Sequence, residues 1–139
     1  MSKSPGRRRL KFDRAEVKEE GDGQRRVLVT LTLGQLIFRA SAAAADGTVG
    51  PLKAAAVATL EAVQEAAANK FTCSLSDLDH VNALGKDLMA VLVDFKFEGR
   101  DVQVFGSCQI AGSEVDCTVK AVLNATNRMF ELAIREQAI

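Results

Sequence analysis

The chain has 139 residues, of which 47% are hydrophobic and 26% are charged, as expected for one globular domain with a buried core. Lysine and arginine number 18, and aspartate and glutamate also number 18, so the formal net charge is zero. A neutral chain has no general electrostatic attraction to nucleic acid or to an anionic membrane. Its apolar runs are also too short to cross a bilayer. We therefore expect no membrane segment and no general binding of nucleic acid.

The beginning of the chain is polar and basic. It contains Pro5-Gly6 and lacks the apolar segment of a secretory signal. We interpret residues 1–8 as a disordered basic arm and residues 9–139 as one duplicated domain. A phosphate-binding role for the arm is the alternative to a simple solvated tail. The basic residues of this block are Lys3, Arg7, Arg8, Arg9, Lys11 and Arg14.

The chain has three cysteines, Cys73, Cys108 and Cys117. No two of them form a CxxC pair, and an odd number argues against a disulfide framework. We predict free thiols that act as small apolar side chains. Free thiols are typical of a reducing compartment, so we expect a cytoplasmic protein.

The first half of the chain predicts three strands followed by one helix. Alternating or β-branched apolar residues indicate the strands, and glycine-containing segments indicate the turns between them. Alanines after Pro51 indicate the helix, because proline suits the first helical turn and alanine has the highest helix propensity. The predicted strands cover residues 10–17, 27–33 and 36–40, and the predicted helix covers residues 51–69.

The second half repeats this order of elements. Ser113 is a good N-cap for the second helix, and Glu114 and Asp116 favour the positive end of its dipole. The predicted segments are an extended one at 71–84, strands at 88–97 and 102–106, and a helix at 114–135. The expected apolar stripes of the two helices are Leu52, Ala56, Leu60, Val63 and Ala67, and then Val115, Val119, Val122, Thr126, Met129 and Ala133.

Local sequence also repeats between the halves. Val29–Leu33 matches Val93–Phe97 at an offset of 64 residues. We therefore predict an α+β fold of two pseudo-symmetric β-β-β-α units, residues 9–69 and 70–139, with antiparallel sheets and one long helix in each unit. One such unit leaves a face uncovered, so the two are expected to pack together as one domain. Exposed sheet edges lead us to expect a homodimer.

The sequence contains no motif for catalysis or metal binding that we recognise. His80 is the single histidine, and on a strand it faces away from Asp77 and Asp79. Gly21-Asp22-Gly23 joins two strands and does not open a helix, so it predicts a turn and not a phosphate-binding loop. We expect a protein that is not an enzyme and that uses no metal and no cofactor.

Two loops of small residues precede the predicted helices at equivalent places in the two units. Free backbone N–H groups at the start of a helix can hold a carboxylate or a phosphate, and glycine lets a ligand approach the backbone closely. The alternative is that both loops are only strand-to-helix turns. The candidate ligand-binding residues are Gly47, Thr48, Gly50, Gly112, Ser113 and Asp116.

From about Leu10 to Arg128 the duplicated pattern resembles the C-terminal allosteric, or dimerisation, domain of the 2-isopropylmalate synthase and citramalate synthase family. The matching positions in the second unit are Gly106, Asp116, Ala121, Ala125, Asn127 and Arg128. Those in the first unit are Gly47, Gly50, Pro51 and Ala54, while Lys53 stands where the family has an acidic residue. The resemblance implies the fold, a dimer and a regulatory site for an amino acid such as leucine or isoleucine.

These observations lead to one hypothesis and one alternative. The hypothesis is a stand-alone, non-catalytic regulatory module that binds a small carboxylate or amino acid. The alternative is a structural dimerisation or scaffold protein, which has a protein partner that the sequence does not identify and no metabolite ligand.

Overall fold

The computed structural model describes residues 9–137, with side chains described up to residue 134, so the predicted arm at residues 1–8 lies outside the described part. Strands and helices follow the predicted order, and the α+β fold of two β-β-β-α units is confirmed. The elements are β1 (Lys11–Glu20), β2 (Gln24–Leu33), β3 (Leu36–Ala44), α1 (Gly50–Ala66), β4 (Thr72–Ala83), β5 (Lys86–Phe97), β6 (Arg100–Gln109) and α2 (Glu114–Gln137).

Each unit forms its own antiparallel sheet. Sheet A has the order β1-β2-β3 and sheet B has the order β4-β5-β6. The first strand of each sheet contains one irregularity of the β-bulge type, between Phe12 and Arg14 in sheet A and between Leu75 and Asp77 in sheet B. A bulge bends a strand and increases its twist. The two units therefore share a local distortion as well as their order of elements.

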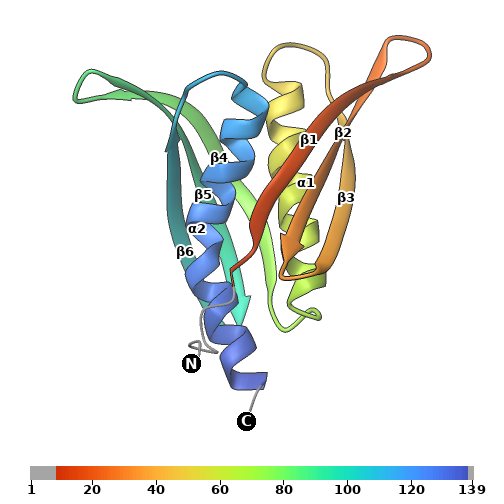
Figure 1. The fold of residues 1–139 in the computed structure, drawn as a ribbon. Helices are drawn as coiled ribbons and strands as arrows, with labels where there is room; N and C mark the ends of the chain where they lie inside the picture. Colours follow the sequence, from red (N-terminus) through yellow and green to blue (C-terminus); the bar gives the residue numbers. More distant parts are fainter. Residues whose placement is uncertain (1–8, 138–139) are drawn as a thin grey trace.

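The two helices lie side by side between the two sheets (Figure 1). Helix α1 contacts β2 and β3 of its own unit, and α2 contacts β5 and β6. Each helix also contacts the first strand of the other unit, so that α1 touches β4 and α2 touches β1. Both helices run in the same direction, and their N-termini lie at the same end of the molecule (Figure 1).

This position buries each helix on all sides but one. The predicted apolar stripes are buried or half-buried, but they are only part of the buried surface, which in α1 also includes Ala54, Ala55, Ala58 and Ala62. What stays exposed is a narrow strip along each helix. The exposed strips are Lys53, Val57, Glu61 and Glu65 in α1 and Lys120, Asn124, Arg128 and Leu132 in α2.

The boundaries differ from the predicted ones at several element ends. Helix α1 ends at Ala66 and not at Asn69, because Ala68 and Asn69 adopt left-handed backbone conformations with φ of 55° and 58°. Such residues end a helix. Strands β3 and β6 are longer than predicted, because their terminal residues continue the pairing with β2 and β5 although they break the apolar alternation.

Small residues let each helix pack closely on the third strand of its unit. In unit one the alanines of α1 lie against a strand that itself carries Ala40, Ala42 and Ala44. In unit two the corresponding contact is made by Gly106 of β6. A Cβ atom at Gly106 would overlap the carbonyl oxygen of Ala121 and would lie 2.5 Å from the nitrogen of Ala125. Glycine is therefore required there by the proximity of the α2 backbone.

The buried polar side chains of the helices are satisfied locally. Thr59, Thr118 and Thr126 are buried, and each donates its hydroxyl to the carbonyl oxygen four residues earlier, at 2.6, 2.8 and 2.9 Å. A buried hydroxyl without a partner would destabilise the core. These bonds let the helices stay close without an unpaired hydroxyl group.

We predict that Gly106→Ala lowers the free energy of unfolding by about 3 kcal/mol, the upper range for a side chain forced into a packed core. The added methyl group meets backbone atoms of α2, which cannot move without displacing the helix. Chemical denaturation followed by circular dichroism measures the change. Gly21→Ala is the matched control, because no atom lies within 4 Å of the added methyl group there. Equal stabilities of the two variants would contradict the packing argument.

Candidate small-molecule site

The two helix-entry loops that carry the candidate residues lie at one end of the domain, because α1 and α2 run side by side in the same direction (Figure 1). Gly47 and Gly112 occupy corresponding turns and have φ of 97° and 88°, in the left-handed region that favours glycine. The structure thus brings the six predicted residues to the same end, in two separate loops.

The start of α1 lacks the usual compensation of a helix N-terminus. Val49 is the N-cap and makes no side-chain hydrogen bond, and the first turn contains no acidic residue. Proline at position 51 has no N–H, but Gly50 and Leu52 carry N–H groups for which the helix supplies no acceptor. The positive end of the α1 dipole therefore lacks an anionic neighbour in its own first turn.

A cationic side chain lies beside this helix start. Arg25 belongs to β2, on the sheet face that is directed toward the helices, and its Nη2 donates to the carbonyl oxygen of Gly47 at 3.1 Å. The hydrogen bond ties the loop to sheet A and keeps the guanidinium near the start of α1. A guanidinium and free backbone N–H groups are the donors that a carboxylate or phosphate accepts from.

Gly50 also has a role that needs no ligand. A Cβ atom at this position would overlap the carbonyl oxygen of Ala45. Gly50 itself is buried, and so is the following Pro51. The loop therefore requires glycine at position 50 for its own close packing. A substitution there would disturb the fold and could not be interpreted as a loss of binding alone.

The start of α2 is different. Ser113 is its N-cap as predicted, and its Oγ accepts the N–H of Asp116 at 3.2 Å. The carbonyl oxygen of Ser113 accepts the N–H of Cys117 at 3.0 Å. Glu114 and Asp116 place two carboxylates in the first turn. Ser113 and Asp116 thus compensate this helix start from within the chain, so an external anion is favoured at α1 and opposed at α2.

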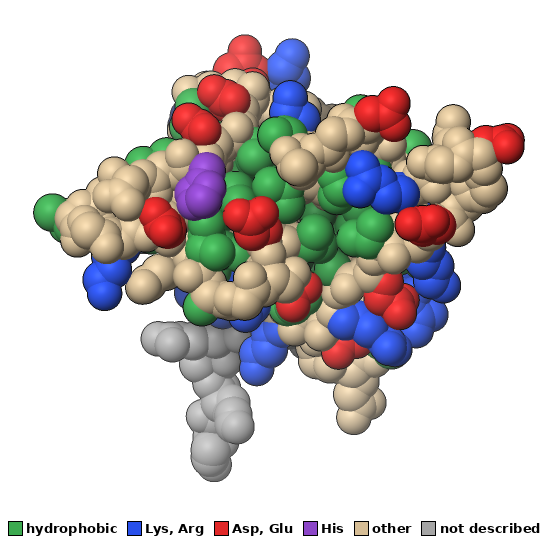
Figure 2. Space-filling view, turned by 90° about the horizontal axis from the view of Figure 1, so that it is seen from above, with side chains coloured by type: hydrophobic (Ala, Val, Ile, Leu, Met, Phe, Trp, Pro, Cys, Tyr) green, Lys and Arg blue, Asp and Glu red, His purple; other side chains and the backbone are tan. Residues whose placement is uncertain are grey.

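Apolar side chains gather in the middle of this end, with charged side chains around them (Figure 2). Val49 is 47% exposed at the α1 entry, and Val17 is 44% exposed on the helix-facing side of β1. The single histidine is also exposed on this view (Figure 2). An end with anion-binding donors and exposed apolar surface has the chemistry to hold a carboxylate that carries an apolar group.

Arg25 and Val49 are the residues of this site that the sequence interpretation missed. Arg25 lies two residues before Val27 in a strand, and period-two alternation places both on the same face. That alternation was the available signal for Arg25. Val49 could not be recognised, because a missing cap is visible only when the start of the helix is known.

Asn127 and Arg128, which carry part of the family resemblance, lie away from the helix-entry loops. They line a groove of about 500 Å³ between β6 and α2. Within it Asn124 Oδ1 accepts the N–H of Ser107 at 3.1 Å and so covers part of the free edge of β6. Asn127 Oδ1 is buried without a hydrogen-bond partner among the described residues.

The other chemically notable side chains lie apart from the entry loops. Arg9 pairs with Glu131 at 3.6 Å, and Lys11 and Arg14 belong to β1, while the rest of the basic block lies outside the described residues. His80 is paired with Met89 on the helix-facing side of sheet B, and Asp77 and Asp79 lie on the opposite face, as predicted. Between residues 9 and 137 no group of three or more histidine, cysteine or acidic side chains could hold a metal ion.

All three cysteines are free thiols. Burial raises the pKa of Cys73 from 9.0 to about 12, and its Sγ lies 3.9 Å from the carbonyl oxygen of Leu60. Burial raises the pKa of Cys117 as well, and the hydrogen bond with Cys108 adds to this effect. The Cys73 and Cys117 thiols therefore stay protonated at neutral pH, as expected for small apolar side chains.

The sequence matches no known protein-family model, and no curated protein matches it significantly. No helix between residues 9 and 137 is both long and apolar enough to cross a membrane. The interpretation of the site therefore depends on the chemistry of the chain itself.

We predict that iodoacetamide modifies Cys73 at pH 8 about a thousandfold more slowly in the folded protein than in urea, because three pKa units separate the two thiolate populations. Timed labelling followed by peptide mass spectrometry measures both rates. The raised pKa also means that the folded state keeps a proton that the unfolded state loses. The contribution of this thiol to stability is therefore fully present below about pH 9 and is lost as the pH rises from 9 toward 12. Equal labelling rates in the two states would rule out a buried thiol.

Proposed function

We propose that the chain is a non-catalytic regulatory module that binds a small carboxylate-bearing molecule, such as an amino acid, at the start of α1. The observation that carries this proposal is the uncapped N-terminus of α1 beside the Arg25 guanidinium. The resemblance to an amino-acid-responsive allosteric domain supports the same class of ligand. The module would act in association with a second copy.

The donors at this site suit an anion with a planar, two-oxygen head. The N–H groups of Gly50 and Leu52 have no acceptor within the helix, and the Arg25 guanidinium is held beside the loop by its hydrogen bond to Gly47. One carboxylate oxygen can accept from the backbone while the other accepts from the guanidinium. An apolar side chain of the ligand would then lie over the exposed surface of Val49.

The same donors suit a binding role. A guanidinium stays protonated throughout the physiological pH range, and backbone N–H groups do not exchange protons with a substrate during a reaction. These donors can therefore hold an anion but do not themselves transfer a proton. Binding would tighten the loop between β3 and α1, which is tied to sheet A by the hydrogen bond of Arg25.

A thermal-shift screen tests the proposal. A ligand that binds only the folded state raises the midpoint, and the stabilisation grows with the logarithm of one plus the ratio of ligand concentration to dissociation constant. We expect a concentration-dependent rise with one class among amino acids and 2-oxo acids, and no rise with nucleotides. No shift with any carboxylate at millimolar concentration would exclude the ligand site and favour the scaffold alternative.

We predict that Arg25→Gln weakens binding of the carboxylate found in that screen by about tenfold or more, the loss of one charge-assisted hydrogen bond. Arg26→Gln is the matched control. Arg26 is the next residue but faces outward, where its Nε lies 3.3 Å from Glu20. Isothermal titration calorimetry on the wild type and both variants measures the change. Equal weakening by both substitutions would mean a general charge effect and would contradict a site at the α1 entry.

A further inference from the structure

The two sheets each have a face that is directed away from the helices. In β2 the buried residues Val27, Val29 and Leu31 face the helices, so the alternate residues face outward. In β5 the same alternation directs Ala90, Leu92 and Asp94 outward. We name these surfaces the outer face of sheet A and the outer face of sheet B. They lie on opposite sides of the domain (Figure 1).

Cationic side chains predominate on the outer face of sheet A. A central cross-strand row consists of Arg14, Thr30 and Arg39, and both arginines are exposed. Thr30 between them is only 7% exposed. The charged residues of this face are Lys11, Arg14, Lys18, Arg26 and Arg39, with Glu16 and Glu20 as the acidic members and Asp13 at the bulge.

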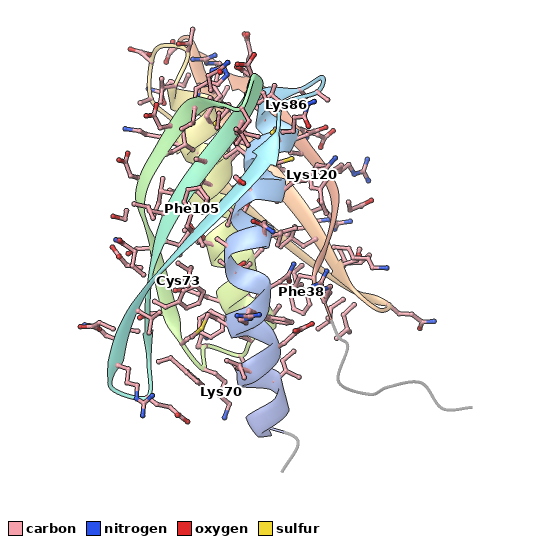
Figure 3. The ribbon with its side chains drawn as sticks, turned by 90° about the vertical axis from the view of Figure 1, so that its left-hand side faces the viewer. Phe38, Lys70, Cys73, Lys86, Phe105 and Lys120 are labelled. Carbon is pink, nitrogen blue, oxygen red and sulfur yellow. The ribbon has the colours of Figure 1, made fainter. Side chains whose placement is uncertain are left out.

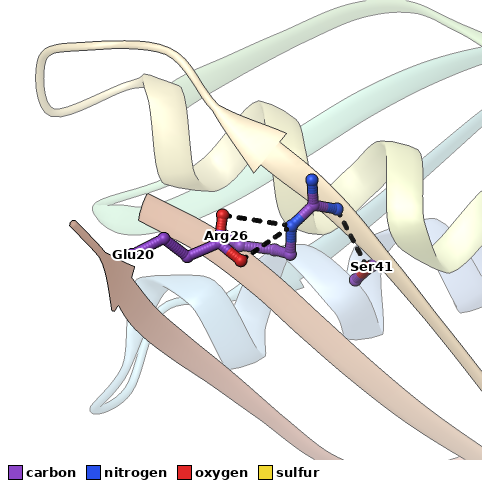
Figure 4. Close-up of polar contacts among 3 residues, drawn as sticks. All are labelled: Glu20, Arg26 and Ser41. Carbon is purple, nitrogen blue, oxygen red and sulfur yellow. Dashed lines mark hydrogen bonds and ion pairs between the residues drawn. The ribbon is translucent and has the colours of Figure 1, made fainter. Parts of the chain in front are cut away.

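The carboxylates on this face do not pair closely with most of its cationic side chains. Arg26 is held between its neighbours, because its Nη1 donates to Ser41 Oγ at 3.1 Å and its Nε lies 3.3 Å from Glu20 Oε2 (Figure 4). Arg14 lies 4.0 Å from Asp13, a long distance for an ion pair. Arg39 has no ion pair among the described residues. The row of Arg14 and Arg39 is thus available to an acidic partner.

The outer face of sheet B has the opposite character. Its corresponding row consists of Asp77, Leu92 and Phe105, and Phe105 is 62% exposed. Figure 3 shows the molecule from this side, with Phe105 at mid-length of the sheet. A shallow hollow of about 200 Å³ lies beside this ring, and Asp77 and Asp79 line it together with Val81 and Leu92.

The two rows occupy equivalent places in the pseudo-symmetric units. Arg14 is the first paired residue after the bulge of β1, and Asp77 is the first paired residue after the bulge of β4. At the same point of the fold, one unit therefore presents two arginines around a threonine. The other presents an aspartate, a leucine and an exposed phenylalanine. The central rows of the two faces thus carry opposite charge.

We propose that the outer face of sheet B docks on the outer face of sheet A of a second copy of this chain. Phe105 would pack on the aliphatic stems and the guanidinium planes of Arg14 and Arg39, a cation–π arrangement. Asp77 and Asp79 would pair with the same cations. Contacts between like faces are disfavoured, because sheet B on sheet B brings carboxylates together and sheet A on sheet A brings arginines together.

The geometry sets the strength and the symmetry of this contact. Each face has three strands of about ten residues, or about 14 by 33 Å, so the contact buries on the order of 1,000 Å² in total. That area is small for a stable complex, so a weak, salt-sensitive association is expected. The joined faces are different surfaces on opposite sides, which makes the contact heterologous and able to continue from copy to copy.

Two variants that each block one face test the proposal. The first is Asp77→Asn, Asp79→Asn and Phe105→Ser, which neutralises sheet B and keeps the side-chain acceptors that receive the N–H groups of Leu78 and His80. The second is Arg14→Glu with Arg39→Glu, which reverses the charge of sheet A. All five positions are exposed, and thermal melts establish that each variant is folded. The matched control is Lys53→Glu with Val57→Ser on the exposed strip of α1.

Sedimentation velocity at about 50 mM and about 500 mM salt measures the association. We expect the wild type and the control to self-associate at low salt and to dissociate at high salt. Each face variant alone should lose at least about tenfold in association constant, as expected when a central contact is removed. An equimolar mixture of the two variants retains one intact face of each kind, so it should form a one-to-one pair.

A wild type that stays monomeric at low salt would overturn the proposal. So would self-association of both face variants at the level of the wild type, which would show another interface. A mixture that forms no pair, although both variants are folded, would also overturn it. These outcomes are independent of the carboxylate site, because the thermal-shift screen reports ligand binding whether or not the copies associate.

Discussion

The structure depends on the close approach of two helices that are enclosed between two sheets. This approach is possible because the surfaces in contact are made of very small residues: alanines on α1 and β3, and Gly106 against Ala121 and Ala125 in unit two. The buried threonines leave the helix layer without unpaired hydroxyl groups. Since the helices are parallel neighbours, both of their entry loops reach the same end of the domain.

The two units share a scaffold but differ at the places that carry chemistry. The start of α2 is compensated by Ser113 and two acidic residues, whereas the start of α1 has no such compensation and lies near Arg25. The outer faces differ in the same way, since one exposes arginines where the other exposes an aspartate and a phenylalanine. The two units thus offer equivalent positions, and only one of each pair carries the features on which the proposals rest.

Much of the fold could be predicted because its signals are local. Alternation of apolar residues indicated the strands, glycines indicated the turns, and Ser113 indicated the start of α2. The predicted end of α1 lies three residues too late, because the sequence does not indicate that Ala68 and Asn69 adopt a left-handed backbone conformation. The enclosure of α1 was also missed. An alanine-rich helix shows no strong contrast between its faces, so the sequence suggested one apolar stripe where nearly all of the helix is buried.

The candidate site was predictable only in part. Loop position and glycine content pointed to Gly47 and Gly112, and both adopt the backbone conformation that glycine favours. What separates the two loops is the presence or absence of a cap, and the guanidinium beside one of them comes from a strand 22 residues away in sequence. Such a relation depends on tertiary packing. The outer faces could not be predicted for the same reason, because alternation identifies two faces of a strand but not which of them the helices cover.

The contact of each helix with the first strand of the opposite unit has a consequence for how this domain folds. Neither half covers its own core alone, since α1 packs against β4 and α2 packs against β1. We therefore expect the halves to unfold cooperatively, since opening of one would expose the core of the other. Two separate β-β-β-α chains would have to form the same contacts between them to cover their cores, so joining the units in one chain makes this association independent of concentration.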